Sequence, residues 1–249
     1  PLDEYVTRHL LNAWAGFLAL FFAAKITRKI LGEQAAIIAV WLMFLSPFFL
    51  GHAMNNPKDI PFAATYIMSI YFMIRLFERL PNPSKKDYLW VILSIGATIN
   101  IRVGGILLIP YLAVFAGILF IVKNYIQQEK VALGTFVKPV LITGVLGYLA
   151  GSLLWPYALQ NPFTNPLNAL SEMSNFKVNI RQLFEGAKIF SGELPVSFLP
   201  KSFIITNSLA ILSGLGLMLI FLWGFRKNKN AAVLYFIFFT AFFPLAYII

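Results

Sequence analysis

The chain contains no cysteine and few charged residues. Without cysteine it has no disulfides, thiolate metal sites or cysteine nucleophiles. Charged residues make up 12% of the 249 residues, against about 25% in an ordinary soluble domain. A 59% hydrophobic content that includes 25 Phe excludes a soluble globule. It also excludes intrinsic disorder, which needs low hydrophobicity and high charge. The expected solvent is lipid.

Several catalytic motifs are missing as well. The sequence has no phosphate-binding P-loop, no GxSxG elbow, no HExxH and no Rossmann glycine pattern. No long apolar run carries a central Asp or Glu of the kind that drives many ion-coupled pumps. These absences disfavour the corresponding enzymes and pumps.

Long apolar runs dominate what is present. A spanning helix needs about 20 apolar residues, and flanking Lys or Arg side chains can reach the interface. Eight runs qualify on that basis: 9–27, 35–53, 60–78, 87–101, 103–122, 137–157, 203–225 and 231–249. The sequence therefore predicts an all-α, polytopic helical membrane protein of about eight transmembrane spans, with residues 1–249 as a single transmembrane domain. Residues 101–105 are predicted to form a tight turn, and one long bent helix is the alternative.

Basic residues alternate in density between successive connections. Thirteen of the 20 Lys and Arg residues lie in one set of connections and seven in the other. Because cytoplasmic loops collect Lys and Arg, the denser set is predicted to face the cytoplasm, with both chain ends outside. The net charge of +10 is explained by this topology, so nucleic acid is not an expected partner.

The longest connection, 158–202, lies on the predicted outer side. Long loops in compact domains are usually functional. After an Asn- and Pro-rich start, apolar residues follow at helical spacing: Leu167, Leu170, Met173, Phe176 and Ile180. We expect a surface helix in the outer interface and a second turn near 181–191, giving one or two short amphipathic helices. Just before this loop, Gly147 and Gly151 are spaced four apart and predict close helix packing.

The outer loop 51–61 carries the densest polar cluster near the membrane: His52, Asn55, Asn56, Lys58 and Asp59. Ionisable groups at membrane depth are functional candidates. The plain alternative is that Asp59 only caps a helix beginning near Pro61, after ordinary turn residues. His52 has no second set of metal ligands beside it, which favours a hydrogen-bonded interface residue over a ligand.

Two arginines on the same predicted side are candidate phosphate contacts. Arg102 lies beside Gly104 and Gly105, and a guanidinium matches phosphate oxygens bidentately. Arg8 opens the first run. The alternative for both is an interface anchor. The nearby acidic pair Asp3-Glu4 is interpreted as a solvated juxtamembrane pair.

These segments together resemble a known family. The run His52–Phe62 (His-Ala-Met-Asn-Asn-Pro-Lys-Asp-Ile-Pro-Phe) resembles the second outer loop of bacterial protein O-mannosyltransferase-like proteins. These are GT-C class membrane glycosyltransferases related to aminoarabinose transferases. Residues 100–105, 154–157 and 194–201 extend the resemblance over most of the chain.

The resemblance implies a glycosyltransferase that moves a hexosyl- or pentosyl-type sugar, with inversion, from a polyprenyl-phosphate donor to a protein or lipid acceptor. The site would face outward from the bacterial cytoplasmic membrane. Within it, Asp59 and His52 would be catalytic, and the substrate-binding residues would be Asn55, Asn56, Lys58, Arg102 and Arg8. No cofactor is assigned, and a divalent metal is left open. The family's main acidic motif is expected ahead of Pro1, which makes this chain an internal piece that is inactive alone.

Two other functions compete with the enzyme. A transporter or flippase of an anionic lipid or solute fits the spans and basic residues, but it predicts interrupted helices in matched halves, which the sequence does not reveal. A non-catalytic membrane scaffold would not need the cluster from His52 to Asp59. We therefore expect the enzyme.

Overall fold

The structure is a computed structural model that describes residues 3–174, 179–221, 224 and 230–248. Its long helices are α1 (Glu4–Leu31), α2 (Glu33–Phe44), α4 (Asp59–Glu78), α5 (Lys85–Ile101), α6 (Leu108–Ile121), α7 (Gly134–Leu153), α11 (Leu209–Phe221) and α12 (Ala231–Ile248). The shorter helices are α3 (Pro47–Asn55), η1 (Val103–Leu107), η2 (Val122–Ile126), α8 (Pro156–Gln160), α9 (Asn165–Ser174), η3 (Ser191–Glu193) and α10 (Phe198–Thr206). The strands are β1 (Arg181–Phe184) and β2 (Ala187–Phe190).

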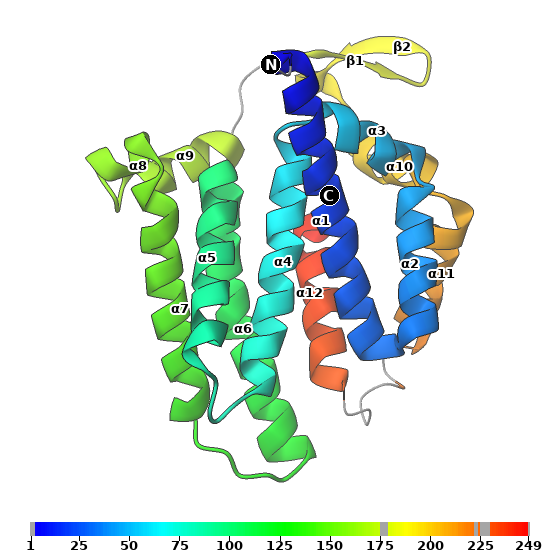
Figure 1. The fold of residues 1–249 in the computed structure, drawn as a ribbon. Helices are drawn as coiled ribbons and strands as arrows, with labels where there is room; N and C mark the ends of the chain where they lie inside the picture. The colour runs from blue at the N-terminus through cyan, green and yellow to red at the C-terminus, as the bar shows by residue number, and fades with distance from the viewer. Residues whose placement is uncertain (1–2, 175–178, 222–223, 225–229, 249) are drawn as a thin grey trace.

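The long helices stand side by side. In the view of Figure 1, α7, α5, α4, α1 and α2 form a row in which each helix packs on the next. Behind this row, α6 contacts α4 and α7, and α12 contacts α6. Many large apolar side chains on these helices are exposed, including Leu141, Leu153 and Ile220, as expected of faces that meet lipid.

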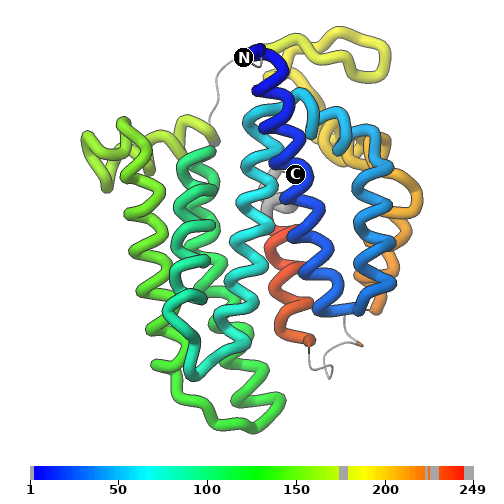
Figure 2. The backbone as a smooth tube through the Cα atoms, viewed as in Figure 1, coloured from blue at the N-terminus to red at the C-terminus, as the bar shows by residue number. Residues whose placement is uncertain are grey.

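The bundle has two distinct ends. The start of α1, α3, α8, α9 and the β1–β2 hairpin lie together at what we call the loop-rich end (Figure 2). The α4–α5 and α6–α7 connections lie at the other end, which we call the basic end because it holds Arg79, Lys85, Lys86, Lys123 and Lys130. The two predicted sets of connections therefore lie at opposite ends. Lys177, Arg226, Lys227 and Lys229 lie outside the described residues.

The predicted fold class is confirmed, but the number of spans is not. Within the described residues, four helices are long and apolar enough to cross a membrane: α1, α4, Val103–Ile126 and α7. Two bent helix pairs would raise the number to six if each is one span. The predicted eight spans are not shown, because α5 has only 17 residues and α12 has a shorter apolar stretch, Ala231–Phe243.

Two predicted spans are broken by sharp bends. The run 35–53 divides into α2 and α3 at an angle of 67°. Pro47 begins α3 and disfavours a helical residue before it, while Ser46 Oγ accepts from Phe49 N at 3.4 Å. The run 203–225 divides into α10 and α11 at 114°. Asn207 is extended there, and Ser208 Oγ accepts from Ile211 N at 3.4 Å. Continuous spans were therefore the wrong prediction at both places.

The outer loop, residues 158–202, agrees with the prediction in part. Helix α9 covers Asn165–Ser174 and confirms the surface helix, while Phe176 lies outside the described residues. Residues 181–190 form an antiparallel hairpin, so the turn predicted near 181–191 lies between two strands and not in a second helix. Glu185 and Gly186 have φ of 52° and 81°, the left-handed pair that a two-residue hairpin turn requires.

Small residues bring α5 and α7 together as predicted. A Cβ on Gly151 would lie 2.7 Å from Ile99 Cβ, and one on Gly147 would lie 2.9 Å from Ile95 Cγ2. Gly96 of α5 contributes from the other side, because its Cβ would lie 2.9 Å from Ala150 Cβ. The two backbones approach this closely only because these three side chains are absent.

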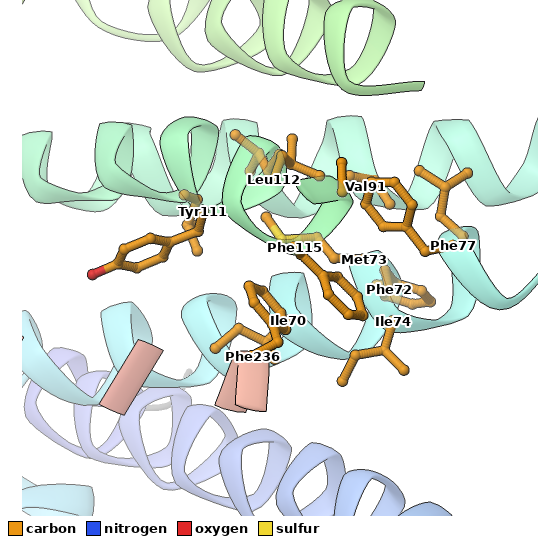
Figure 3. Packing of buried hydrophobic residues seen from close by; sticks show 14 of the residues in the cluster. Ile70, Phe72, Met73, Ile74, Phe77, Val91, Tyr111, Leu112, Phe115 and Phe236 are labelled. Carbon is orange, nitrogen blue, oxygen red and sulfur yellow. The ribbon is translucent and has the colours of Figure 1, made fainter. Parts of the chain in front are cut away.

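The core is an apolar cluster between α4, α5, α6 and α12 (Figure 3). Phe115 stacks on Phe236 with ring centroids 4.1 Å apart and meets Phe77 edge-on at 5.1 Å. At the basic end, the buried Asp87 of α5 forms ion pairs with arginines at the end of α4 and so links the two helices. Its carboxylate accepts from Arg79 Nη1 at 2.8 Å and Arg75 Nε at 3.2 Å, and from Ser84 N at 2.9 Å. This packing fixes the positions of the elements that carry the candidate site.

Candidate functional site at the loop-rich end

Asn56 organises the turn between α3 and α4. Its Oδ1 accepts the backbone N–H groups of Lys58 at 3.2 Å and Asp59 at 2.9 Å. This satisfies free donors at the start of α4. The capping role that the sequence left open for Asp59 therefore belongs to Asn56.

The amide nitrogen of Asn56 links two other candidate residues. Asn56 Nδ2 donates to Asp59 Oδ2 at 2.7 Å and contacts His52 Nδ1 at 3.0 Å. Because the amide nitrogen is a donor, His52 Nδ1 accepts, which leaves its hydrogen on Nε2. The imidazole, the amide and the carboxylate thus form one connected polar chain.

Arg102 completes this chain from the end of the neighbouring helix α5. Helix α5 ends at Ile101, and Arg102 is extended, with φ −148° and ψ 138°. A Cβ on Gly105 would lie 2.8 Å from Thr98 O, so the turn can close only on glycine. The predicted tight turn is confirmed. It brings Arg102 Nη1 into an ion pair with Asp59 Oδ1 and its guanidinium 5.9 Å from the Phe62 ring centroid.

The ion pair is accessible from outside the bundle. The side chains of Arg102 and Asp59 are 43% and 54% exposed to solvent. Exposed pairs contribute about 0–1 kcal/mol to stability, so this one can be exchanged for another partner at small cost.

Helix α1 holds α3 in place through His9 and through Asn12, which was not among the predicted site residues. Asn12 Nδ2 donates to the carbonyls of His52 at 3.0 Å and Ala53 at 2.9 Å. His9 Nδ1 donates to Met54 O at 2.6 Å. Asn12 is buried, and an amide inside an apolar run is the only sequence signal that would have found it.

The connected polar chain does not include the other three predicted site residues. Asn55 and Lys58 flank the turn and are exposed, and neither side chain has a hydrogen-bond partner within the described residues. Arg8 forms an ion pair with Glu4 on the surface of α1, where both side chains are at least 75% exposed. Arg8 thus lies at the same end but contacts none of His52, Asn56 and Asp59 in the described part of the chain.

The cluster presents one cation, one carboxylate, one imidazole and one amide at the loop-rich end. A guanidinium binds phosphate oxygens, and a carboxylate or imidazole can accept a proton. Within the described residues no group of three His, Cys, Asp or Glu side chains is placed to hold a metal ion. The arrangement suits transfer of a group from a phosphate ester.

One comparison with known proteins finds a related family. Residues 7–155 match the family model described as dolichyl-phosphate-mannose-protein mannosyltransferase. No curated protein and no solved structure matches the chain. The matched range is more than half of the chain and includes Asn12, His52, Asn56, Asp59 and Arg102. The chain therefore belongs to the dolichyl-phosphate-mannose-protein mannosyltransferase family and is a membrane glycosyltransferase.

Proposed function

We propose that this protein transfers a sugar from a polyprenyl-phosphate donor to a protein or lipid acceptor, with inversion, at the outer face of a bacterial cytoplasmic membrane. The reacting groups meet at the loop-rich end, beside the cluster of His52, Asn56, Asp59 and Arg102. The observation that carries this proposal is the exposed Arg102–Asp59 ion pair, which joins the α3–α4 turn to the α5–η1 turn.

Arg102 is proposed to hold the donor phosphate. Its only anionic partner within the described residues is Asp59. The singly charged phosphodiester of the donor can replace that carboxylate and accept two parallel N–H bonds. During transfer the bond between the anomeric carbon and the phosphate oxygen breaks, and the leaving phosphate takes the electron pair. A fixed cation at this point stabilises the charge that develops.

Asp59 is proposed to act on the acceptor. When phosphate takes Arg102, Asp59 loses its partner in the ion pair, and its Oδ1 is free to accept a hydrogen bond from the acceptor hydroxyl. The acceptor hydroxyl can then give its proton to Asp59 while its oxygen forms the new bond to the anomeric carbon. His52 orients this carboxylate through Asn56.

The proposal is tested by donor binding to the Arg102→Ala variant. Losing one charged hydrogen-bonding partner costs about 1.5–3 kcal/mol. At about 1.4 kcal/mol per decade, binding of polyprenyl-phosphate-mannose should weaken about ten- to a hundredfold. Arg181→Ala is the matched control, because Arg181 lies on β1 at the same end and outside the cluster. If donor affinity is unchanged in Arg102→Ala, only the interface-anchor role remains for Arg102.

One observation favours a transporter as the second candidate. Interrupted helices line the substrate paths of many transporters, and the two helix breaks here meet in one groove, lined by Ser46, Pro47, Thr206 and Ser208. A transporter predicts movement of an intact lipid or solute across the membrane, with no sugar transferred. Product analysis after incubation with the donor and an acceptor separates the two functions.

A further inference from the structure

A groove of about 720 Å³ lies between α5 and α7 at the basic end. Residues 81–83, just before α5, also line the groove. Helix α5 runs from this groove to the Arg102 turn, and its 17 residues span about 25 Å at about 1.5 Å per residue. The groove is therefore separate from the candidate site for sugar transfer.

The walls of the groove change from charged to apolar along its length. Helix α5 contributes Lys85, then Leu89 and Ile92, and α7 contributes Lys138, then Ile142 and Leu146. Residues three or four apart share one face of a helix. Both helices run from the basic end toward the loop-rich end (Figure 1). Lys85 and Lys138 lie in the first turns of α5 and α7, so they lie at the same end of the groove. The apolar residues reach about 10–12 Å deeper.

The two lysines have no compensating charge. Neither forms an ion pair within the described residues, and no carboxylate is among the residues that line the groove. Some other cations at this end are paired, as Lys29 is with Glu78 and Lys123 with Glu129. Asp87, the acidic residue closest in sequence to Lys85, is buried and taken by Arg75 and Arg79. The groove thus combines two free cations with apolar walls.

We propose that this groove binds an anionic phospholipid of the leaflet at the basic end. The headgroup phosphate lies between Lys85 and Lys138, and an acyl chain lies along Ile92, Ile142 and Leu146. A free phosphate ion would use the lysines and gain nothing from the walls, whereas a lipid uses both. Lysines near a membrane surface attract anionic lipids, and the basic end is the predicted cytoplasmic side, where such lipids collect.

The test is lipid binding to the purified protein in detergent, measured by native mass spectrometry. Phosphatidylglycerol is the probe, and phosphatidylcholine and inorganic phosphate are the comparisons. The wild-type protein should retain phosphatidylglycerol in preference to both. The double variant Lys85→Gln with Lys138→Gln should bind phosphatidylglycerol about thirtyfold more weakly.

The matched control is Lys86→Gln with Lys130→Gln, which removes the same charge from the same end outside the groove. It should leave phosphatidylglycerol binding near the wild-type level. Equal loss in both double variants would mean diffuse attraction and would overturn the proposal. Equal retention of phosphatidylcholine, or of inorganic phosphate, would overturn it as well.

A second measurement uses the wild-type protein alone. A phosphatidylglycerol analogue with a photoreactive acyl chain should label peptides of α5 and α7 that contain Ile92, Ile142 or Leu146. Labels confined to other helices would contradict the assigned groove. Neither experiment depends on sugar transfer, so failure here and failure of the proposed function can be told apart.

Discussion

The sequence left two roles open for Asp59, a helix cap and a site residue. In the structure Asn56 takes the capping role. Its Oδ1 caps α4, while its Nδ2 holds Asp59 and contacts His52. Asp59 is therefore free of any capping duty, and both of its oxygens are used by Asn56 and Arg102. A substitution at Asp59 can remove the charge without removing the cap.

In the full-length enzyme, Asp59→Asn should fold normally and lose turnover by roughly 10²-fold or more, the scale of general acid–base contributions. Stability should change by no more than about 1 kcal/mol, because the lost ion pair is exposed. Turnover with polyprenyl-phosphate-mannose and the melting temperature in detergent are the two readouts. Glu185→Gln is the control, since Glu185 is an exposed carboxylate at the same end that pairs with Lys201. Near-wild-type turnover of Asp59→Asn would refute its place in the site.

The sequence predicts the members of the cluster better than their contacts. His52, Asn56, Asp59 and Arg102 stand out because polar groups between apolar runs are rare. The Arg102–Asp59 contact joins positions 43 residues apart, and no local pattern encodes which helices become neighbours. Asn12 was missed for the same reason: its role depends on α1 packing against α3.

At the scale of elements, local chemistry decides where spans break. The apolar run 35–53 has the length of a span, yet Ser46 and Pro47 end one helix and start another within it. The Asn207-Ser208 pair does the same between α10 and α11. Hydropathy alone counts such runs as continuous, because it averages over the residues that break the backbone. The Gly-xxx-Gly pattern of α7 predicted close helix packing correctly, because it marks directly where two helix backbones can approach.

Gly151→Ala should destabilise the α5–α7 contact. The new methyl group would meet Ile99 Cβ at 2.7 Å, and overpacking of this kind typically costs about 1–3 kcal/mol. Gly117→Ala on α6 is the matched control, because its methyl group would meet nothing within 4 Å. The control should be neutral or stabilised by up to about 1 kcal/mol through helix propensity. Melting temperatures in detergent that fall equally in both variants would show that the contact is not close.

On the scale of the whole molecule, the bundle separates two kinds of chemistry. The loop-rich end carries α9 and the hairpin (Figure 1), and the polar cluster lies there too. The basic end carries the α5–α7 groove and most of the cations of the described residues. The alternation of basic residues along the sequence predicts this separation, and the helix directions in the structure agree with it. Which end faces the cytoplasm is the remaining prediction.

Single cysteines can test this orientation, because the chain has none of its own. Lys188→Cys on β2 should react with a membrane-impermeant thiol reagent in intact cells. Lys86→Cys at the basic end should react only after permeabilisation, since basic connections stay in the cytoplasm. The reverse labelling pattern would place the candidate site inside the cell and contradict transfer at the outer face.

The Arg102–Asp59 pair is where the proposed function and a purely structural explanation differ most. If the pair only ties α4 to the α5–η1 turn, reversing both charges should preserve what it does. The most direct measurement is therefore sugar transfer by the full-length enzyme carrying the double variant Asp59→Arg with Arg102→Asp, beside each single variant. We predict a melting temperature near that of the wild type and turnover reduced by roughly 10²-fold or more, because the phosphate and the acceptor each lose their partner. Turnover restored by the swap to near the wild-type level would contradict the proposed site.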